Sequence, residues 1–165
     1  MIDTAINAVG KVELKLYDHN NCIIDQRSVN NIVTNDGKLT MLRLYSNTSG
    51  AVPLYLGIGT GTSTPSVSDT NITQLGSLTN RVSVGTKALV AYNNVDVAVN
   101  SYGTNVNQII WKGTFAAGNG TNAAVTEAGI FTAATGGLLF ARCTFAAINK
   151  NSGSRLDIYW GLTIS

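Results

Sequence analysis

The sequence predicts a mainly β protein, a single antiparallel β-sandwich domain of the jelly-roll-like kind with one short helix near residues 36-46. Apolar and polar residues alternate with a period of two over several segments. Turn-forming residues are frequent, because the chain has 17 Gly and is rich in Asn, Ser and Thr. A length of 165 residues without internal repeats favours one domain over 1-165, in which residues 1-10 are a candidate N-terminal arm.

A β-hairpin is predicted first. Residues 11–17 alternate between apolar and charged side chains, which is typical of a strand with one buried face. An Asn-rich turn follows, and residues 22–34 return as the second strand. The turn carries the single histidine, His19, which we expect to be solvated rather than a metal ligand or a catalytic base.

A helix is predicted next. Asn35 is the expected N-cap, because an Asn side chain accepts a hydrogen bond from a backbone N–H of the first turn. Leu39, Leu42 and Tyr45 recur at helical spacing. We therefore expect residues 38–45 to be largely buried, packed across an opening of the sheet.

The following segment, residues 54–62, contains Gly57, Gly59 and Gly61. It matches neither the dinucleotide-binding fingerprint nor the P-loop, so we interpret it as a strand whose glycines permit close packing or a bulge. Residues 62–78 form a polar connector. Because a structureless loop of that length is unusual in a compact domain, we expect an ordered arm or a contact-making loop.

The second half of the chain is predicted to be almost entirely β. Shorter strands are expected over residues 81–91, 95–99 and 109–116. The last forty residues have the clearest pattern and predict a three-stranded meander over residues 125–131, 138–145 and 155–164. The total is eight or nine strands and one helix.

Composition excludes several classes of function. Charged residues make up 12% and the formal charge is +2, without a basic run, which argues against nucleic-acid binding. No apolar stretch approaches the length of a membrane span, and no signal peptide is visible, so we expect synthesis in a cytoplasm without export. Cys22 and Cys143 are expected to be buried thiols rather than a disulfide, and no metal or cofactor motif occurs.

The acidic residues do not form a catalytic set, and no serine lies in a nucleophile-elbow motif, so the sequence predicts no enzyme. Glu127 is notable because it interrupts an otherwise apolar strand. A buried carboxylate needs a cation or several hydrogen-bond donors, and Arg142 on the next strand is the natural candidate. We therefore predict a structural ion pair between Glu127 and Arg142.

Five stretches resemble, in the same order, a family of small tailed-phage virion proteins, and the resemblance spans about Lys11 to Ile164. The stretches are Asn31-Ile32-Val33-Thr34-Asn35, Leu56-Gly57-Ile58-Gly59-Thr60-Gly61-Thr62 with Pro65, Val125-Thr126-Glu127-Ala128-Gly129-Ile130-Phe131, Gly136-Gly137-Leu138-Leu139-Phe140-Ala141-Arg142, and Ile148-Asn149-Lys150. Members are described as tail-fibre, head-fibre or capsid-decoration proteins. The resemblance implies an oligomeric β-structured virion component without catalysis or cofactor.

The expected function is that of a capsid decoration or cement protein that stabilises the head shell. The alternatives are a tail, fibre or baseplate component that binds host glycan, and a carbohydrate-binding module outside any virion. The expected partners are the major capsid protein or tail proteins, and further copies of the chain. Leu138 and Phe140 are candidate subunit-interface residues, because residues 138–145 carry apolar side chains on both faces. The resemblance suggests a homotrimer.

Overall fold

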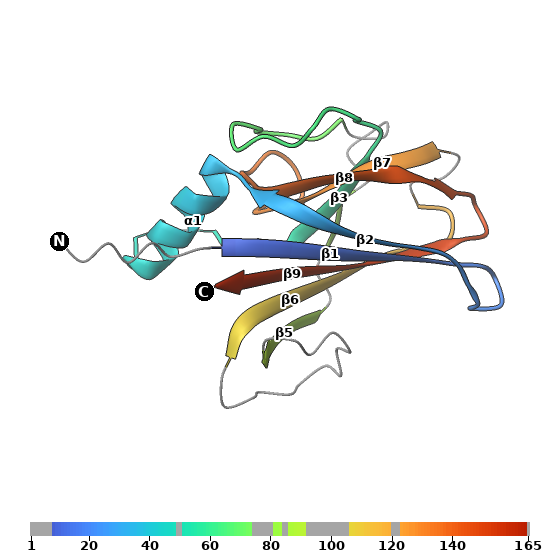
Figure 1. Cartoon of the computed structure of the whole chain (residues 1–165), viewed down its shortest axis with the longest axis horizontal. Helices are drawn as coiled ribbons and strands as arrows, with labels where there is room; N and C mark the ends of the chain where they lie inside the picture. Colours follow the sequence, from blue (N-terminus) through green and yellow to red (C-terminus); the bar gives the residue numbers. More distant parts are fainter. Residues whose placement is uncertain are drawn as a thin grey trace.

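Nine antiparallel strands and one helix make up the described part of the chain in this computed structural model (Figure 1). The structure describes residues 8–48, 51–73, 81–83, 86–91, 106–119 and 123–164. The elements are β1 (Ala8–Tyr17), β2 (Ile23–Val33), α1 (Asn35–Tyr45), β3 (Tyr55–Gly59), β4 (Arg81–Ser83), β5 (Thr86–Ala91), β6 (Val106–Phe115), β7 (Ala123–Phe131), β8 (Leu139–Lys150) and β9 (Arg155–Ile164). The predicted mainly antiparallel β class and the single short helix are confirmed.

All nine strands belong to one sheet, in the order β4-β3-β7-β8-β2-β1-β9-β6-β5. Its two edge strands, β4 and β5, follow each other in the sequence with only residues 84 and 85 between them. Ser83 and Thr86 are therefore at most about 11 Å apart, since consecutive Cα atoms are 3.8 Å apart. The two edges of the sheet must lie close together, so the sheet curls into a nearly closed barrel.

The core fills the inside of this curled sheet. Trp111 of β6 and Phe140 of β8 meet there edge to face, with ring centroids 6.0 Å apart. These two rings come from the two halves of the sheet, so they join its opposite walls. Gly113 of β6 faces Leu56 of β3 so closely that a Cβ at this position would overlap the leucine. The core therefore depends on contacts between strands that are distant in the sheet order.

The last three strands do not form the predicted meander. β7 and β8 are paired, but β9 pairs with β1 on one side and β6 on the other. The alternation in β9 correctly predicts a buried face that includes Leu156, Ile158 and Trp160, while Ile164 at its end is 46% exposed. An alternating pattern identifies the buried face of a strand but contains no information about its neighbours in the sheet.

Several strand boundaries also differ from the predictions. The predicted strand 81–91 is two strands, β4 and β5, at opposite edges of the sheet. β8 continues to Lys150, five residues past its predicted end. The expected strand at residues 95–99 lies outside the described residues. Of the candidate N-terminal arm, Ala8 to Gly10 belong to β1, and Ala8 pairs with Ile164 so that these two positions are neighbours.

The helix begins one residue after its cap, which is Thr34 rather than Asn35. The Thr34 hydroxyl accepts a hydrogen bond from the Gly37 N–H and donates to the Leu139 carbonyl, so it fixes the helix start to β8. A Cβ at Gly37 would overlap the Phe140 carbonyl, which shows how closely α1 approaches β8. Gly37 and Thr40 are the buried residues of the helix.

The prediction that residues 38–45 are largely buried is wrong. Leu39 is 41% exposed, Leu42 is 67% exposed and Tyr45 is 95% exposed. Positions at i, i+3 and i+6 share one side of a helix, and here that side is turned away from the core. The helix docks through its small residues instead, because only they allow the close approach to the Phe140 carbonyl. We call Leu39, Leu42 and Tyr45 the α1 stripe.

Candidate functional site

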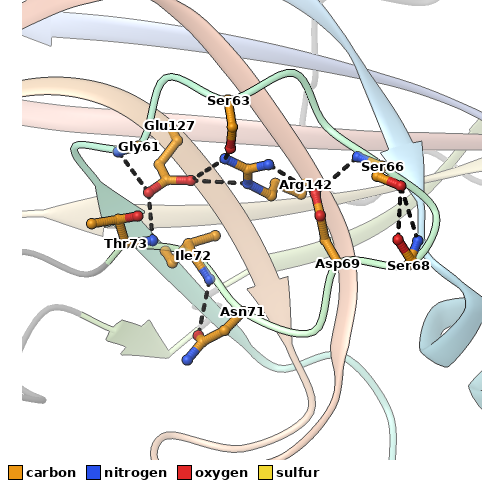
Figure 2. A network of polar contacts seen from close by, with 10 residues as sticks. All are labelled: Gly61, Ser63, Ser66, Ser68, Asp69, Asn71, Ile72, Thr73, Glu127 and Arg142. Atoms are coloured by element: carbon orange, nitrogen blue, oxygen red, sulfur yellow. Dashed lines mark hydrogen bonds and ion pairs between the residues drawn. The ribbon is translucent and has the colours of Figure 1, made fainter.

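The most extensive polar network in the described chain lies where residues 60–73 pass over β7 and β8 (Figure 2). The two ends of this segment are joined, because the Thr60 N–H donates to the Thr73 carbonyl at 3.0 Å. A 14-residue segment with joined ends is an Ω-loop. Its middle is attached to the helix start through the Asn35 N–H, which donates to the Val67 carbonyl at 2.7 Å. The predicted contact-making loop is therefore ordered over the described residues of the connector.

Glu127 of β7 holds the two ends of the Ω-loop together. Its Oε1 accepts hydrogen bonds from the Gly61 N–H at 2.7 Å and from the Thr73 N–H at 2.5 Å. Its Oε2 faces the Arg142 guanidinium, with Nε at 2.9 Å and Nη2 at 2.8 Å. A carboxylate has about four lone-pair sites, and all of them are used here. The side chain is 0% exposed.

Arg142 of β8 attaches the middle of the Ω-loop to the sheet. Besides Glu127, its guanidinium donates to Asp69 Oδ2 at 2.8 Å and to Ser63 Oγ at 3.1 Å. Asp69 Oδ2 also accepts the Ser66 N–H at 2.9 Å. One buried cation therefore holds a carboxylate from the sheet and a carboxylate from the loop, as Figure 2 shows.

The electrostatics follow from this geometry. Burial acts to raise the pKa of Asp69, but the Ser66 N–H and the Arg142 guanidinium act in the opposite direction and together leave the pKa below its ordinary value. Burial disfavours the charged form of Arg142, yet hydrogen bonds and charges from Asp69 and Glu127 raise its pKa. The guanidinium is therefore charged at any pH at which the protein is folded.

The Ω-loop also covers apolar surface outside the barrel. Ile72 of the loop packs with Phe131 and Leu139 in a second buried cluster, on which Tyr55 lies. A Cβ at Gly59 would overlap the Thr73 carbonyl, and one at Gly61 would overlap the Glu127 carboxylate. The glycines of this segment therefore permit close packing, because a side chain at these positions would overlap a neighbouring group.

The two candidate interface residues must be reconsidered. Phe140 is 2% exposed and belongs to the core, so its assignment to a subunit interface is wrong. Ile130 pairs with Ala141 and Phe131 pairs with Leu139, which leaves Phe140 as the extra residue of a β-bulge. The bulge interrupts the alternation and lets both Phe140 and Ala141 enter the core. Leu138 is half-buried just before β8.

The cysteines differ from each other. Cys143 is buried, and burial raises the pKa of its thiol to about 12, so it is chemically inert. Cys22 is exposed, so its predicted burial is wrong. It lies in the turn before β2, where the chain is already outside the core. Both thiols are free, and His19 in the same turn is exposed.

A second buried cation stabilises the opposite end of the barrel. Lys150 at the end of β8 is 1% exposed, and its Nζ donates to the Ala116 and Ser154 carbonyls at 2.9 and 2.8 Å. Burial lowers the pKa of this lysine. The side chain ties the loop after β6 to the turn before β9, which explains structurally why a lysine follows the apolar part of β8.

Glu127 and Arg142 could be predicted from the sequence as partners, and the structure pairs them. Asp69 and Ser63, which come from the loop, were not predicted. The available signal was the spacing of Ser66 and Asp69, which is typical of an acidic side chain that accepts a local backbone N–H. Nothing in that spacing indicates that Asp69 would also reach Arg142, 73 positions away.

The network is suited to holding a loop rather than to chemistry. Glu127 has no lone pair left for a metal or a substrate proton. The charge of Arg142 is balanced by the carboxylates of Glu127 and Asp69. Within the described residues, no cluster of three or more metal-ligating side chains occurs. No helix in that part of the chain is long and apolar enough to cross a membrane. Comparisons of the chain with known protein families, curated proteins and solved structures found no match.

Proposed function

We propose that this chain is a non-enzymatic structural protein of a tailed-phage virion, a capsid decoration or cement protein that binds the head shell and stabilises it. The observation that carries the proposal is the α1 stripe. A free soluble domain normally turns the apolar side of its helix inward, but here Leu39, Leu42 and Tyr45 point outward. An exposed apolar surface of this kind marks a contact with another protein.

The surroundings of the stripe indicate what such a partner offers. Lys38 and Arg43 are exposed on the same helix and flank the apolar side chains. A complementary partner surface is an apolar groove with an acidic rim. The low charged fraction of 12% supports the same conclusion, because a weakly charged surface does little to oppose association. The virion setting comes from the sequence resemblance.

The proposal includes self-association into a homotrimer, which also comes from the resemblance. The apolar side chains on both faces of residues 138–145 do not support it. The outer face of β8 does not need a neighbouring subunit as a cover, because the Ω-loop of the same chain covers it through Ile72. The α1 stripe and the low surface charge remain as support for oligomerisation.

The finer fold assignment belongs to the same proposal. We assign the curled sheet to the jelly-roll-like β-sandwiches, with β3, β7 and β8 as one wall and β1, β9 and β6 as the other. The contact of Trp111 with Phe140 across the core supports two facing walls. The continuous pairing through Ile32–Arg142 and Val33–Ala141 joins the walls at one end.

The test is binding to stripped capsids and stripped tails side by side, read by co-sedimentation. We expect the protein to co-sediment with the capsids. The double variant Leu42→Asp/Tyr45→Asp should fold normally but should no longer co-sediment with them. Ile23→Asp is the matched control, because Ile23 is another exposed apolar residue, at 50% exposure, and it lies beside the β1–β2 turn, at the end of the barrel away from α1 (Figure 1). Gold-labelled antibody on intact particles should mark the head.

Other outcomes decide between the alternatives. Recovery on tails and gold label on the tail would favour a tail, fibre or baseplate component with host-glycan binding. Recovery on neither would leave a carbohydrate-binding module as the better interpretation. Light scattering of the purified protein should give a mass of three chains of 17.3 kDa each, or a multiple of three chains if trimers associate further. A monomer at every concentration would contradict the oligomer.

A further inference from the structure

The long strand β2 has an open edge. On one side it pairs with β1 from Ile23 to Asn31. On the other side its pairing with β8 covers only Ile32 and Val33. Among the described residues, the segment 23–31 is therefore hydrogen-bonded to a neighbour on one side. Ile23 is 50% exposed and Ile24 is 54% exposed, so the side chains of this segment also lack a cover.

This edge is guarded in an unusual way. Free edges usually carry lysine, proline or a bulge that prevents a further strand from pairing. The segment 23–31 has no Lys and no Pro, and its bulge lies at its first residues, between Ile23 and Asp25. Its charges, Asp25 and Arg27, lie on the core-facing side, because they pair with Leu16 and Leu14. The two side chains form an ion pair and are 24% and 33% exposed. Inward-facing charges exclude most incoming strands, but two opposite charges admit a strand with the reverse order of signs.

A second copy of β2 is such a strand. In an antiparallel pair with a two-fold axis through Gln26, Asp25 faces Arg27 of the second copy, and its own Arg27 faces the second copy's Asp25. The order of the two charges, negative then positive, is therefore complementary to itself when the strand is reversed. We propose that two chains associate through this edge, β2 to β2, with the axis at Gln26.

Other registers are less favourable. Residues that face each other in a continuous sheet must lie on the same side of it, so the axis has to pass through a residue rather than between two. An axis at Asp25 or at Arg27 places two like charges opposite each other, which destabilises a strand pair. An axis at Ile24 or at Ser28 leaves both charges without a partner across the interface. The Gln26 register pairs all four.

The geometry of the open edge agrees with this register. The paired segment extends from Ile24 to Ser28, because the bulge between Ile23 and Asp25 limits it at one end, and it ends before Ile32, where β2 pairs with β8. Five facing residues in an antiparallel ladder contribute roughly four to six backbone hydrogen bonds, since every second pair exchanges two. Val29 and Phe145 are only partly buried where they pack on the core, so the added strand also covers the gap between β2 and β8.

This two-fold contact goes beyond the proposed function and is independent of it, because it needs no shell. It is also separate from a three-fold contact. Sedimentation equilibrium distinguishes the cases by mass: two chains for the β2 contact alone, and six for trimers joined in pairs. A mass of three chains or one chain at the highest soluble concentration would overturn the β2 contact.

The decisive experiment uses charge reversal and mixing. Asp25→Arg places Arg against Arg across the axis, and Arg27→Asp places Asp against Asp. We expect each variant alone to dissociate roughly tenfold more readily than the wild type, since opposite charges in a strand pair attract and like charges repel. When the two variants are mixed, both cross-axis pairs have opposite charges again, and association should return.

Mixing separates the intermolecular contact from the one within the chain. Both variants lose the Asp25–Arg27 pair of their own strand, so a gain on mixing arises only across the interface. The double variant Asp25→Arg/Arg27→Asp keeps its own pair and should associate with itself but not with the wild type. Failure of the mixture to associate, with both variants folded by tryptophan fluorescence, would overturn the proposal.

Cross-linking gives a second readout that does not depend on charge. With Cys22→Ser as background, Gln26→Cys places two thiols on the axis, and mild oxidation should give a covalent dimer. Ser28→Cys is the matched control, because Ser28 faces Ile24 and not another Ser28. Equal cross-linking of both variants would contradict the Gln26 register. Cys143 does not interfere, because it is buried with its pKa raised to about 12.

Discussion

Glu127 binds two backbone N–H groups through one oxygen and a guanidinium through the other, so its removal affects the loop and the ion pair together. Arg142→Met leaves the buried carboxylate with its two N–H donors but without a cation. We expect a loss of about 3 kcal/mol in the free energy of unfolding, as is typical when one partner of a buried pair is removed. Urea denaturation measures it.

The coupling between the two side chains is the informative quantity. Glu127→Gln should also destabilise, because Arg142 is then balanced by Asp69 alone. The double variant should lose at least about 1 kcal/mol less than the sum of the single losses. Additive losses would show that the two side chains act independently. The destabilisation caused by Glu127→Gln would then come from its contacts with the Ω-loop.

Asp69 gives the network a dependence on pH. Its pKa in the folded protein lies below the ordinary 3.8, because the Ser66 N–H and Arg142 outweigh burial. A lowered carboxyl pKa stabilises the fold fully above the unfolded-state pKa, and this contribution is lost as the pH falls through the folded-state pKa. The stability advantage of the wild type over Asp69→Asn should therefore be constant near neutral pH and shrink below about pH 3.8.

The measurement is thermal unfolding of both proteins between neutral and acidic pH. If the stability difference between the two proteins stays the same down to the lowest pH at which both fold, the charge of Arg142 does not lower the pKa of Asp69. Asp69 is the residue of the network that sequence patterns could not supply, because its partner comes from a strand far away in the sequence.

At the scale of elements, the Ω-loop depends on its glycines. Gly61→Ala should displace the Glu127 carboxylate, since a Cβ there overlaps it. We expect a loss of about 2 kcal/mol, because buried hydrogen bonds at the loop ends are then strained or broken. Gly153→Ala is the control. The nearest atom to its Cβ is 3.6 Å away, so its effect should stay within about 0.5 kcal/mol.

Comparable losses for the two glycine variants in chemical denaturation would contradict a specific role for the loop ends. Resistance to proteolysis within residues 60–73 provides a second measurement, because a released loop becomes a substrate. Gly61→Ala should increase cleavage there, and Gly153→Ala should not.

The individual strands could largely be predicted from the sequence, but the way in which they pair with one another could not. The period of two identified β1 and β9 because each has one buried face, whereas β2 was predicted from the turn before it and β7 from its apolar composition. The same reasoning failed at Phe140, where a bulge places two consecutive residues in the core. It failed again at the helix, where Leu39, Leu42 and Tyr45 have the spacing of a buried face. The small residues Gly37 and Thr40 determine which side of the helix packs on the sheet. Hydrophobic periodicity considers large apolar side chains and does not take these two residues into account.

At the scale of the whole molecule, a substitution of Phe140 tests whether this residue stabilises the core of the chain or a contact between subunits. Phe140→Ala should cost about 3–5 kcal/mol in the free energy of unfolding, because it removes the ring that meets Trp111 across the barrel. The oligomeric mass of the folded fraction should not change. A variant with wild-type stability and a smaller mass would restore Phe140 as an interface residue.

The curled sheet itself lay beyond sequence reasoning. Its closure depends on β4 and β5 occupying the two edges although they are successive in the chain, and on β9 inserting between β1 and β6. These are pairings between distant segments, and each strand pattern is compatible with many of them. The class of fold was predictable because it depends on local patterns, whereas the order of strands depends on how the walls pack.

The pairing of Ala8 with Ile164 has a practical consequence for engineering. Both positions emerge at the end of the barrel that carries α1, while the β1–β2 turn lies at the other end (Figure 1). A peptide joined to the chain at Ala8 or at Ile164 would therefore emerge on the side of α1, where the proposed partner contact lies. A peptide inserted at Asn20, which is exposed in that turn, would emerge at the opposite end. Under the proposed function, display of a foreign peptide should accordingly use the β1–β2 turn rather than the ends of β1 and β9.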